Sequence, residues 1–440
     1  MRKRSEIDTR ASMYNIYFKT DSEEYLVYNT LWGSIIKIDE EAKECLNNNT
    51  FEGLSDEILS MLTQNGFVVD TDETSVFQVF MNRLKYQNNT ICFILIPTHR
   101  CNMACTYCYQ GAGDILVNSM NEEILEKTLK FIKRMATGCL GISISLYGGE
   151  PFLESKKILT MLENLQCYCQ GENKSLRVGG TTNGTLLDED LIIKLKEYLI
   201  DDLQITFAGP KRFHDKKRIY KNGVGTYDRL IEVLKLLKKH GVRYHVRVDV
   251  DEENYPYIGE LLDDLIDKLG KPPRLSFQRT SCDLFLNKEQ MVRISEISDE
   301  RLHELYALAD AKGYKTNPIY IGNYRVGCGA IFDNTYVIDP VGDVYKCEAA
   351  VGNLDHRLGT ISEDGSLINI NQKAYYKWVL RNPLQFEECR NCEFAPICFA
   401  GCALKAYAQF GDIDRPVCHK DQYRPNIETY LRDYYPEKWR

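Results

Sequence analysis

The spacing of apolar and polar positions changes twice along the chain and divides it into three parts. From residue 13 to about 88, short alternating runs predict three strands at 14–18, 25–29 and 34–38. Amphipathic spacing then predicts helices at about 40–48, 55–64 and 76–86. The segment GFVVDTDET, residues 66–74, predicts a short strand and a polar turn after the second helix. This part is expected to form a small unit with its own core.

A second pattern extends from residue 90 to about 312, where apolar runs alternate with amphipathic helical segments. Alternation of this kind predicts a parallel sheet whose strands are joined by helices. Six such units favour a partial (βα)6 barrel rather than a full barrel of eight. Chemistry in such barrels takes place at the C-terminal ends of the strands. The expected strands are 91–96, 141–147, 176–181, 203–207, 243–249 and 274–278.

After about residue 313 the alternation stops and cysteines become frequent in a segment with little continuous apolar sequence. A segment of this kind needs metal or cross-links, because its own core is small. The sequence therefore predicts an α/β protein with three domains: residues 1–88, residues 89–312 as the barrel, and a cysteine-rich domain in residues 313–440.

Charge and hydropathy exclude several classes of protein. The formal net charge is -8 over 440 residues, with both signs mixed along the chain, which argues against a nucleic-acid partner. The longest apolar run, residues 91–97, is far shorter than the ~20 residues of a membrane helix. The basic start MRKRSEIDTR is not followed by the apolar stretch of a signal peptide, so we expect a cytoplasmic protein without a membrane span.

The chain has 16 cysteines, and disulfides do not persist in a reducing compartment. Ligation of metal or of an iron-sulfur cluster is the leading explanation for the ten that fall into groups. Isolated cysteines pack as small apolar side chains. We apply that interpretation to Cys45, Cys92, Cys139, Cys167, Cys169 and Cys282.

One group of cysteines follows the first expected barrel strand. ICFILIP continues into THRCNMACTYCYQ, where Cys101, Cys105 and Cys108 have CxxxCxxC spacing. Three thiolates can hold three irons of a 4Fe-4S cube and leave the fourth iron open. S-adenosylmethionine needs such a vacancy, since its amino and carboxylate groups chelate the open iron. Zinc is the alternative, but a structural zinc site needs four ligands, and only His99 lies near enough in sequence to be the fourth.

With Tyr107 inside it, this motif resembles the signature of the radical S-adenosylmethionine (SAM) superfamily. YGGEP at the end of the second strand resembles the family's GGE motif, and the resemblance implies that Gly148, Gly149 and Glu150 meet the cofactor's ammonium group. TTNGT at the end of the third strand likewise implies a hydrogen bond from Asn183 to the cofactor. An Asn-Gly turn is the structural alternative, and the two roles can coexist.

A fourth stretch, FAGPKRFHDKKR, resembles the family's DGPxxxHDxxR segment. The resemblance implies that Arg218 pairs with the cofactor carboxylate. One residue departs from the pattern, because Ala208 stands where an aspartate is usual.

The cysteines near the C-terminus resemble the seven-cysteine SPASM pattern, which in its fullest form binds two auxiliary 4Fe-4S clusters. Gly342 precedes Cys347 in this pattern, and CRNCEFAPICFAGC supplies CxxCx5CxxxC. The resemblance implies a first cluster on Cys328, Cys347 and Cys402. It implies a second on Cys389, Cys392, Cys398 and Cys418. A zinc ribbon is the alternative, because CxxC pairs also bind zinc.

Enzymes with this extension modify peptides and proteins, so the resemblance implies a maturase that cross-links a ribosomally made precursor peptide. Thioether formation is favoured, and a carbon-carbon bond is the second option. The N-terminal part resembles a winged-helix-like module that binds the precursor's leader as an added strand. A flavodoxin- or ferredoxin-like protein is the electron donor that the family implies.

Two other classes remain open. One is an anaerobic sulfatase-maturating type that oxidises Cys or Ser to formylglycine, although Cys101 here follows some ninety residues and those enzymes usually begin close to their cluster loop. Glu348 resembles in position their proton acceptor, and a solvated surface carboxylate is its other interpretation. The other class is a non-catalytic electron carrier or zinc module, which would have no use for a cofactor pocket.

The first auxiliary cluster raises a further question. Sulfatase maturases carry an extra cysteine where this chain has Asn334, which leaves three expected ligands. A vacant iron could then bind a substrate thiolate. Cys282 or another side chain could instead complete the set.

Overall fold

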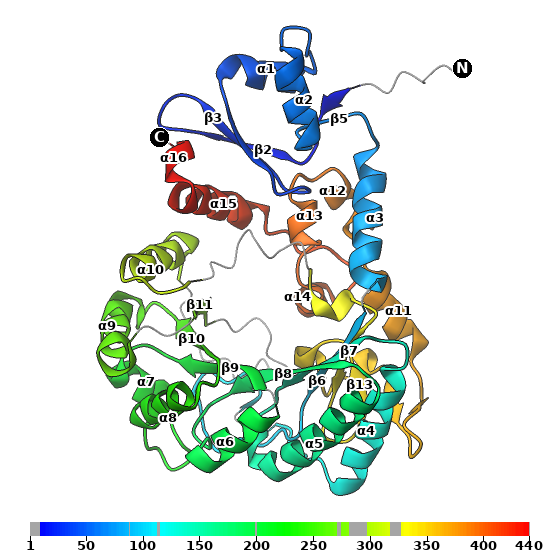
Figure 1. Cartoon of the computed structure of the whole chain (residues 1–440), viewed down its shortest axis with the longest axis vertical. Helices are drawn as coiled ribbons and strands as arrows, with labels where there is room; N and C mark the ends of the chain where they lie inside the picture. The colour runs from blue at the N-terminus through cyan, green and yellow to red at the C-terminus, as the bar shows by residue number, and fades with distance from the viewer. Residues whose placement is uncertain are drawn as a thin grey trace. The chain divides into compact units, whose positions relative to one another are not determined.

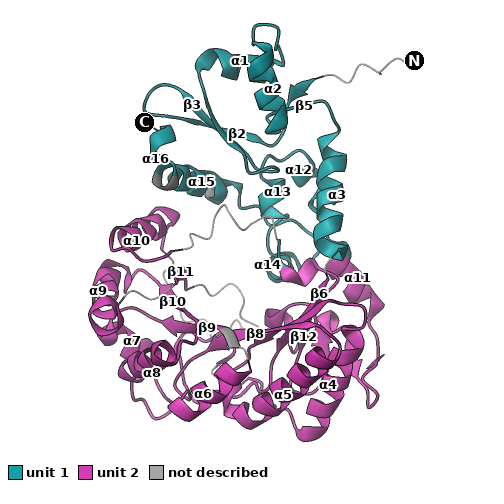
Figure 2. Cartoon of the chain, viewed as in Figure 1, with its two compact units in different colours: residues 1–87, 318–328, 380–440 teal, residues 88–317, 329–379 magenta. Residues whose placement is uncertain are grey.

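The computed structural model describes residues 9–87, 89–111, 115–198, 200–270, 274–280, 297–316 and 327–439. The chain forms two compact units (Figure 2). Unit 1 is residues 1–87, 318–328 and 380–440, and unit 2 is residues 88–317 and 329–379. None of the helices in the described ranges is long and apolar enough to span a bilayer.

Unit 2 is built on six parallel strands that follow one another in chain order across a single sheet (Figure 1). Their positions agree with the sequence-based prediction to within a few residues. They are β6 (Thr90–Leu95), β7 (Gly141–Leu146), β8 (Ser175–Thr182), β9 (Ile200–Phe207), β10 (Tyr244–Val250) and β11 (Leu275–Arg279).

Helices join these strands, and several begin at a side-chain cap. Asn121 caps α4 by accepting from the Ile124 amide at 2.8 Å, and Asp188 caps α6 by accepting from the Leu191 amide at 2.8 Å. The helices are α4 (Glu122–Met135), α5 (Ser155–Gly171), α6 (Glu189–Glu197), α7 (Lys211–Lys217), α8 (Tyr227–His240), α9 (Ile258–Leu269) and α10 (Asp299–Ala311).

The same sheet continues beyond the barrel strands. β12 (Thr335–Ile338) pairs in parallel with β6, and the antiparallel strands β13 (Asp343–Tyr345), β14 (Gly359–Ile361) and β15 (Leu367–Ile368) follow. The helix α11 (Gln372–Leu380) comes next. The first part of the cysteine-rich segment thus extends the barrel sheet. These strands have only two to four residues, which is too short for a periodic pattern to be seen in the sequence.

The N-terminal part of unit 1 contains the expected strands and helices. β2 (Asn15–Lys19), β3 (Tyr25–Asn29) and β4 (Ile35–Ile38) form an antiparallel sheet in that order. α1 (Glu40–Asn48) and α2 (Asp56–Gln64) follow, then the strand β5 (Val68–Val69), which pairs with β1 (Arg10–Ala11), and α3 (Glu73–Tyr86).

This small sheet has an apolar core on each face. Val27 packs with α1 and α2 residues such as Leu46 and Leu62. The neighbouring positions on the strand, Leu26 and Tyr28, point to the other face, as the two-residue period of a strand requires. There they pack with residues of the C-terminal segment. The second core consists of Ile16, Phe18, Leu26, Tyr28, Phe394, Ile397, Ile427, Leu431 and Trp439.

The C-terminal segment of unit 1 carries five of the grouped cysteines on short helices and turns. Its helices are α12 (Glu387–Arg390), α13 (Ala395–Cys398), α14 (Ala403–Phe410), α15 (Lys420–Tyr434) and α16 (Pro436–Trp439). The segment contacts the N-terminal sheet by hydrogen bonds as well. Thr30 Oγ1 donates to the Glu393 carbonyl at 2.5 Å, and Arg424 Nη2 donates to the Tyr17 carbonyl at 2.8 Å. Residues 9–87 therefore share one core with residues about 400 positions later in the chain.

Candidate functional site

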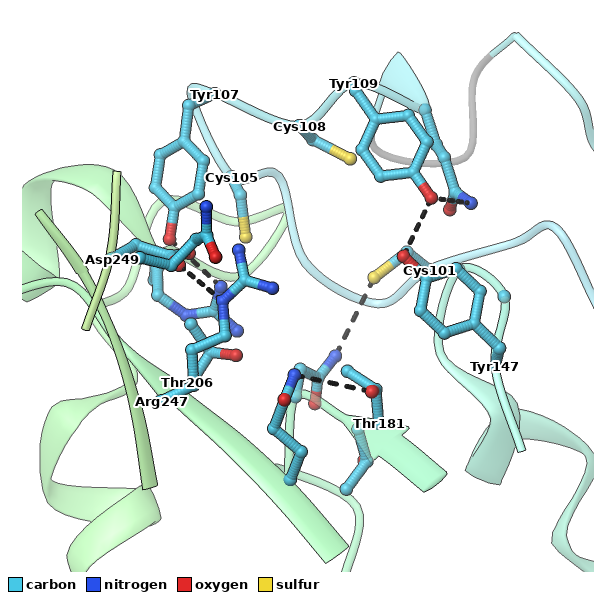
Figure 3. A pocket seen from close by; sticks show the side chains of 18 of the residues that line it. Cys101, Cys105, Tyr107, Cys108, Tyr109, Tyr147, Thr181, Thr206, Arg247 and Asp249 are labelled. Atoms are coloured by element: carbon cyan, nitrogen blue, oxygen red, sulfur yellow. Dashed lines mark hydrogen bonds and ion pairs between the residues drawn. The ribbon is translucent and has the colours of Figure 1, made fainter. Parts of the chain in front are cut away.

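A cavity of about 390 Å³ opens at the C-terminal ends of the parallel strands in unit 2 (Figure 3). Its wall comes from the loop after β6, the turn after β7, and the ends of β8 to β11. Glu348 and Ala349, in the 3-10 turn η7 (Glu348–Ala350), complete it. The cavity thus lies at the edge of the sheet where barrel enzymes carry their chemistry.

The three cysteines of the CxxxCxxC loop all line this cavity. Burial, with smaller contributions from Glu150 and the thiols of Cys105 and Cys108, raises the pKa of Cys101 to about 11. No three His, Cys, Asp or Glu side chains in the described ranges converge closely enough to hold a single metal ion. A 4Fe-4S cube takes one thiolate per iron, so its ligands stand apart around the cube. Three thiols that line one cavity fit the three cysteine ligands of a cube whose fourth iron is open.

The two glycines after β7 allow the backbone to pass directly against the cluster loop. A Cβ on Gly149 would lie 2.2 Å from the Arg100 carbonyl oxygen, and one on Gly148 would lie 2.4 Å from that of Thr98. Gly148 also has a φ of 133°, which disfavours side chains. The Glu150 amide donates to the Arg100 carbonyl at 2.9 Å. The turn after β7 therefore packs against the loop that carries Cys101 and is hydrogen-bonded to it.

Glu150 lies behind the cavity wall, with none of its surface exposed. Its carboxylate accepts hydrogen bonds from Thr182 Oγ1 at 2.7 Å, from the Asn183 amide at 2.7 Å and from the Phe152 amide at 3.1 Å. Burial raises its pKa to about 6, and these hydrogen bonds act in the opposite direction. Glu150 therefore fixes the end of β8, and its contact with the cofactor stays a prediction.

Asn183 lines the cavity and connects the end of β8 to the cluster loop. Its Nδ2 donates to Asn102 Oδ1 at 2.8 Å and lies 3.7 Å from Cys101 Sγ. Its Oδ1 accepts from the Thr185 amide at 2.9 Å. Asn183 is 8% exposed, so its orientation is set by the protein.

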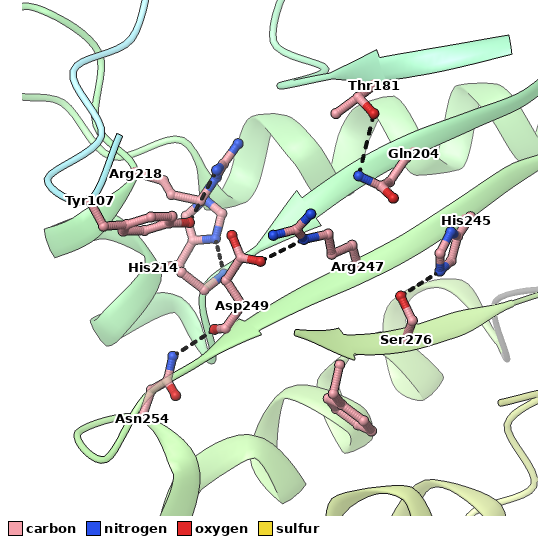
Figure 4. A network of polar contacts seen from close by, with 12 residues as sticks. Tyr107, Thr181, Gln204, His214, Arg218, His245, Arg247, Asp249, Asn254 and Ser276 are labelled. Carbon is pink, nitrogen blue, oxygen red and sulfur yellow. Dashed lines mark hydrogen bonds and ion pairs between the residues drawn. The ribbon is translucent and has the colours of Figure 1, made fainter. Parts of the chain in front are cut away.

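Tyr107 and Arg218 meet on the opposite wall, where Arg218 Nη1 donates to Tyr107 Oη at 3.2 Å (Figure 4). Arg218 is 8% exposed, and its Nε has no hydrogen-bond partner among the residues that the structure describes. A buried cation with an unused donor beside a cavity fits an anionic ligand. The carboxylate of an amino-acid-like cofactor such as S-adenosylmethionine satisfies that requirement.

His214 positions Arg218 through a short hydrogen-bonded chain. Its Nδ1 accepts from the Ala208 amide at 3.3 Å, and burial holds its pKa well below the usual range, so the ring is neutral with its proton on Nε2. Nε2 lies 3.0 Å from Thr226 Oγ1, which donates to the Arg218 carbonyl at 2.8 Å. Ala208, the departure from the family pattern, therefore contributes through its backbone.

The sequence analysis did not identify two further pairs of cavity residues. Arg247 Nε donates to Asp249 Oδ1 at 2.7 Å (Figure 4), and Tyr109 Oη and Tyr147 Oη lie 2.8 Å apart (Figure 3). Burial raises the Tyr109 pKa well above the usual range, and Tyr147 and Glu348 raise it further. Arg247 and Asp249 occupy alternate positions of an expected barrel strand, which is the signal that marks them as inward-facing.

The cysteines of the C-terminal pattern divide between the two units. Cys347 belongs to unit 2, and Cys328 and Cys402 belong to unit 1. Unit 1 also contains Cys389, Cys392, Cys398 and Cys418. Burial, together with the other three of these thiols, raises the pKa of Cys389 to about 12. These four thiols therefore lie near one another, as a shared cluster needs. Cys282 lies outside the described residues, and Asn334 Nδ2 donates to the Thr90 carbonyl at 2.5 Å.

Comparisons with known proteins agree with this geometry. Residues 95–265 match the radical SAM superfamily, and residues 328–393 match SPASM, an iron-sulfur cluster-binding domain. A cysteine-type anaerobic sulfatase-maturating enzyme of Clostridium novyi is 24% identical over 361 residues, which cover 75% of this chain and 94% of that protein.

Two solved structures share the fold. The enzyme anSMEcpe with bound AdoMet and the Kp18Cys peptide has a TM-score of 0.61 at 20% identity, covering 79% of this chain and 98% of that one. SuiB of Streptococcus suis bound to the precursor peptide SuiA has a TM-score of 0.56 at 16% identity, covering 94% of this chain and 100% of that one.

A radical SAM domain uses S-adenosyl-L-methionine and a 4Fe-4S cluster, and a SPASM domain binds auxiliary iron-sulfur clusters. The three thiols, the glycine turn and the buried arginine of the cavity all lie in the matched radical SAM segment. The chain is therefore a radical SAM enzyme whose radical SAM domain is followed by an auxiliary-cluster SPASM domain.

Proposed function

We propose that this enzyme is a peptide maturase, which abstracts hydrogen from a ribosomally made precursor peptide and installs a cross-link. The observation that carries the proposal is the N-terminal sheet and its helices, which lie outside the barrel. The likeness to SuiB with its precursor peptide extends over 94% of this chain, against 79% for anSMEcpe. The additional length is what a leader-recognition module would occupy.

The edge strand β4 is the proposed site for the leader. Within the described part of the sheet, β4 pairs with β3 alone. At the opposite edge, the Tyr17 carbonyl of β2 already accepts from Arg424. An extended peptide adds to a sheet at an open edge, where main-chain hydrogen bonds give affinity. The leader is therefore expected to pair with Ile35–Ile38.

In the cavity, we assign Cys101, Cys105 and Cys108 to the cluster and Arg218 to the cofactor carboxylate. Asn183 and Tyr107 line the same cavity and would orient the cofactor. When bound, the cofactor and its cluster supply a 5'-deoxyadenosyl radical, and a flavodoxin- or ferredoxin-like protein is the proposed electron donor. The protein's part is to hold the cofactor, to exclude water and to place the peptide against it.

Glu348 is the proposed proton acceptor for a substrate thiol. It lines the cavity, and the Tyr109 and Tyr147 hydroxyls lie close enough for its charge to raise their pKa values. The two tyrosine hydroxyls lie 2.8 Å apart, within hydrogen-bond distance, and a carboxylate near them can act as a general base. The Glu348→Gln variant should still cleave S-adenosylmethionine but should lose peptide turnover.

The products of a cysteine-containing precursor distinguish the candidate reactions. The probe is a synthetic precursor peptide encoded by a short open reading frame near the gene, with S-adenosylmethionine and dithionite under anaerobic conditions. A thioether maturase removes two hydrogen atoms and retains the sulfur as a new C–S bond. A sulfatase-type enzyme removes the sulfur and leaves an aldehyde. Intact peptide with no 5'-deoxyadenosine would favour the non-catalytic electron carrier and contradict the proposal.

A carbon-carbon cross-link also removes two hydrogens and retains the sulfur. Alkylation with iodoacetamide separates it from a thioether, because only the free thiol of a carbon-linked product reacts. Thioether formation is favoured by the first auxiliary cluster, for which the SPASM resemblance supplies three cysteines and Asn334 stands at the extra position. We propose that its open iron holds the substrate thiolate.

A further inference from the structure

Arg381 lies between the cysteine-bearing turns of the C-terminal segment in unit 1. Its side chain is among the largest that the fold buries completely, at 2% exposure. Its guanidinium donates to four backbone carbonyls. Nε donates to Ile413 at 2.9 Å, Nη1 to Phe399 at 2.9 Å, and Nη2 to Ala400 at 2.9 Å and to Arg415 at 2.8 Å.

These carbonyls belong to the two turns that carry three of the thiols. Phe399 and Ala400 lie between Cys398 and Cys402, and residues 413–415 lead toward Cys418. The first turn has left-handed backbone at three consecutive residues, with φ of 53° at Phe399, 63° at Ala400 and 72° at Gly401. Such a conformation costs energy at non-glycine residues and persists where neighbouring groups hold it. Arg381 is the side chain that holds it.

The second turn packs directly against the first. A Cβ on Gly401 would lie 2.2 Å from the Val417 carbonyl oxygen, and the Val417 amide donates to the Ala400 carbonyl at 3.1 Å. Cys398 and Cys418 are thereby brought together at the ends of the two turns. The five donors of one planar guanidinium are suited to bridging several carbonyls, which a lysine cannot reproduce.

The charge of Arg381 needs compensation that carbonyls supply only in part. Burial lowers its pKa, and Cys402, Asp414, Cys389 and Cys398 act in the opposite direction, so these groups lie within electrostatic range. A second cation adds to this demand, because Lys85 is 3% exposed and its Nζ donates to the Arg381 carbonyl at 2.6 Å. Burying cations is costly unless an anion lies nearby. A 4Fe-4S cluster on four thiolates would add its negative charge to that of Asp414 in this region.

We propose that Arg381 is a positioning residue of the auxiliary cluster on Cys389, Cys392, Cys398 and Cys418, where it assembles the cysteine turns and its charge raises the cluster's reduction potential. A cation beside a cluster stabilises the reduced, more negative state, and net charge is one of the factors that set the potential. The inference rests on the proposed ligand assignment for the SPASM domain.

The test uses the full chain in a background with Cys101, Cys105 and Cys108 replaced by alanine, so that only auxiliary clusters remain. Iron content and the potential of each paramagnetic signal are measured for Arg381→Gln, Arg381→Lys and the parent. Arg381→Gln should lower the potential of one auxiliary cluster or lose about four irons per chain, since the charge and most donors are gone. Arg381→Lys retains the charge and should keep a potential close to that of the parent, with reduced iron.

Arg432→Gln is the matched control, because Arg432 lies in the same segment, is 44% exposed, and pairs with Glu428 and Asp21. It should leave iron content and both potentials unchanged. If Arg381→Gln does not fold, Arg381→Lys decides, and full iron with loss of the parental potential would contradict the role of the charge. If both variants keep the iron content and the reduction potentials of the parent, the inference about Arg381 is wrong, and the assignment of the auxiliary clusters is unaffected. A parent without iron would overturn the ligand assignment and this inference with it.

Discussion

The carboxylate of Glu150 accepts a 2.7 Å hydrogen bond from the backbone amide of Asn183, which is 33 residues later in the chain. Glu150 belongs to the turn after β7, and Asn183 follows β8. The same carboxylate also receives the hydroxyl of Thr182 at 2.7 Å. One buried side chain therefore aligns the ends of two neighbouring strands at the cavity.

Replacing Glu150 with glutamine should weaken S-adenosylmethionine binding. The glutamine side chain has one accepting oxygen where the carboxylate has two, so one buried backbone amide would lose its acceptor. Loss of such a hydrogen bond costs about 1–3 kcal/mol. Equilibrium binding of the cofactor to the cluster-loaded enzyme measures the effect. Glu163→Gln, on an exposed position of α5, should bind the cofactor as the wild type does. Unchanged affinity in Glu150→Gln would show that the alignment of β8 is not needed.

Replacing Gly149 with alanine should reduce assembly of the cluster on Cys101. The new Cβ would lie 2.2 Å from the Arg100 carbonyl, so the cluster loop must move. Iron content and the absorbance of the cluster check this in a chain whose SPASM cysteines are replaced. Gly171→Ala is the control, because a Cβ at that position meets nothing within 4 Å. A full complement of iron in Gly149→Ala would contradict the proposed close approach.

Replacing Phe18 with alanine should lower the stability of unit 1 by about 3–5 kcal/mol, because Phe18 is 3% exposed in the core shared with the C-terminal segment. Its ring centroid lies 6.5 Å from that of Trp439. Thermal unfolding of the full chain measures the loss. Ile58→Ala, 42% exposed on α2, should change stability little. A small effect at both positions would mean that the two segments fold independently.

Asp339 should make stability depend on pH. It is 3% exposed in the turn between β12 and β13, and burial raises its pKa to about 7. The folded state then holds the proton more tightly than the unfolded state, whose carboxyl titrates near 4. Stability should therefore fall as the pH rises from about 4 to about 7 and then level off.

The Asp339→Asn variant removes this titration and keeps an oxygen for the Val341 and Asp343 amides, which donate at 3.0 Å and 2.9 Å. Denaturant unfolding at several pH values compares it with the wild type. The variant should gain stability relative to the wild type as the pH rises toward 7. A constant difference across that range would contradict the raised pKa.

Local sequence patterns predict the elements of the barrel, because each strand and helix carries its own periodicity. The six strands from β6 to β11 and the glycine turn at Gly148 are of this kind. The outward contacts of β2 and β3 are different, because the partners of Phe18 and Tyr28 lie near residues 394–439. No short window of sequence contains both sides of that contact.

Side-chain direction is also difficult to predict at the site. Glu150 follows one expected strand and Arg247 lies within another, yet Glu150 is buried behind the cavity wall and Arg247 lines the cavity. Burial of Glu150 depends on donors from β8, and the motif that contains it does not indicate where those donors lie. The grouping of Cys389, Cys392, Cys398 and Cys418 is implied by the family resemblance and stays a prediction as a ligand set.

The shared core of the small N-terminal sheet has a consequence for exchanging parts between related enzymes. A graft of residues 1–87 alone would leave Ile427, Leu431 and Trp439 of the recipient facing foreign strands. The transferable piece is instead unit 1, whose segments 1–87, 318–328 and 380–440 must come from one parent. Any chimera that exchanges the N-terminal sheet would therefore also inherit the donor's cysteines in residues 380–440, so the sheet and these cysteines would be exchanged together.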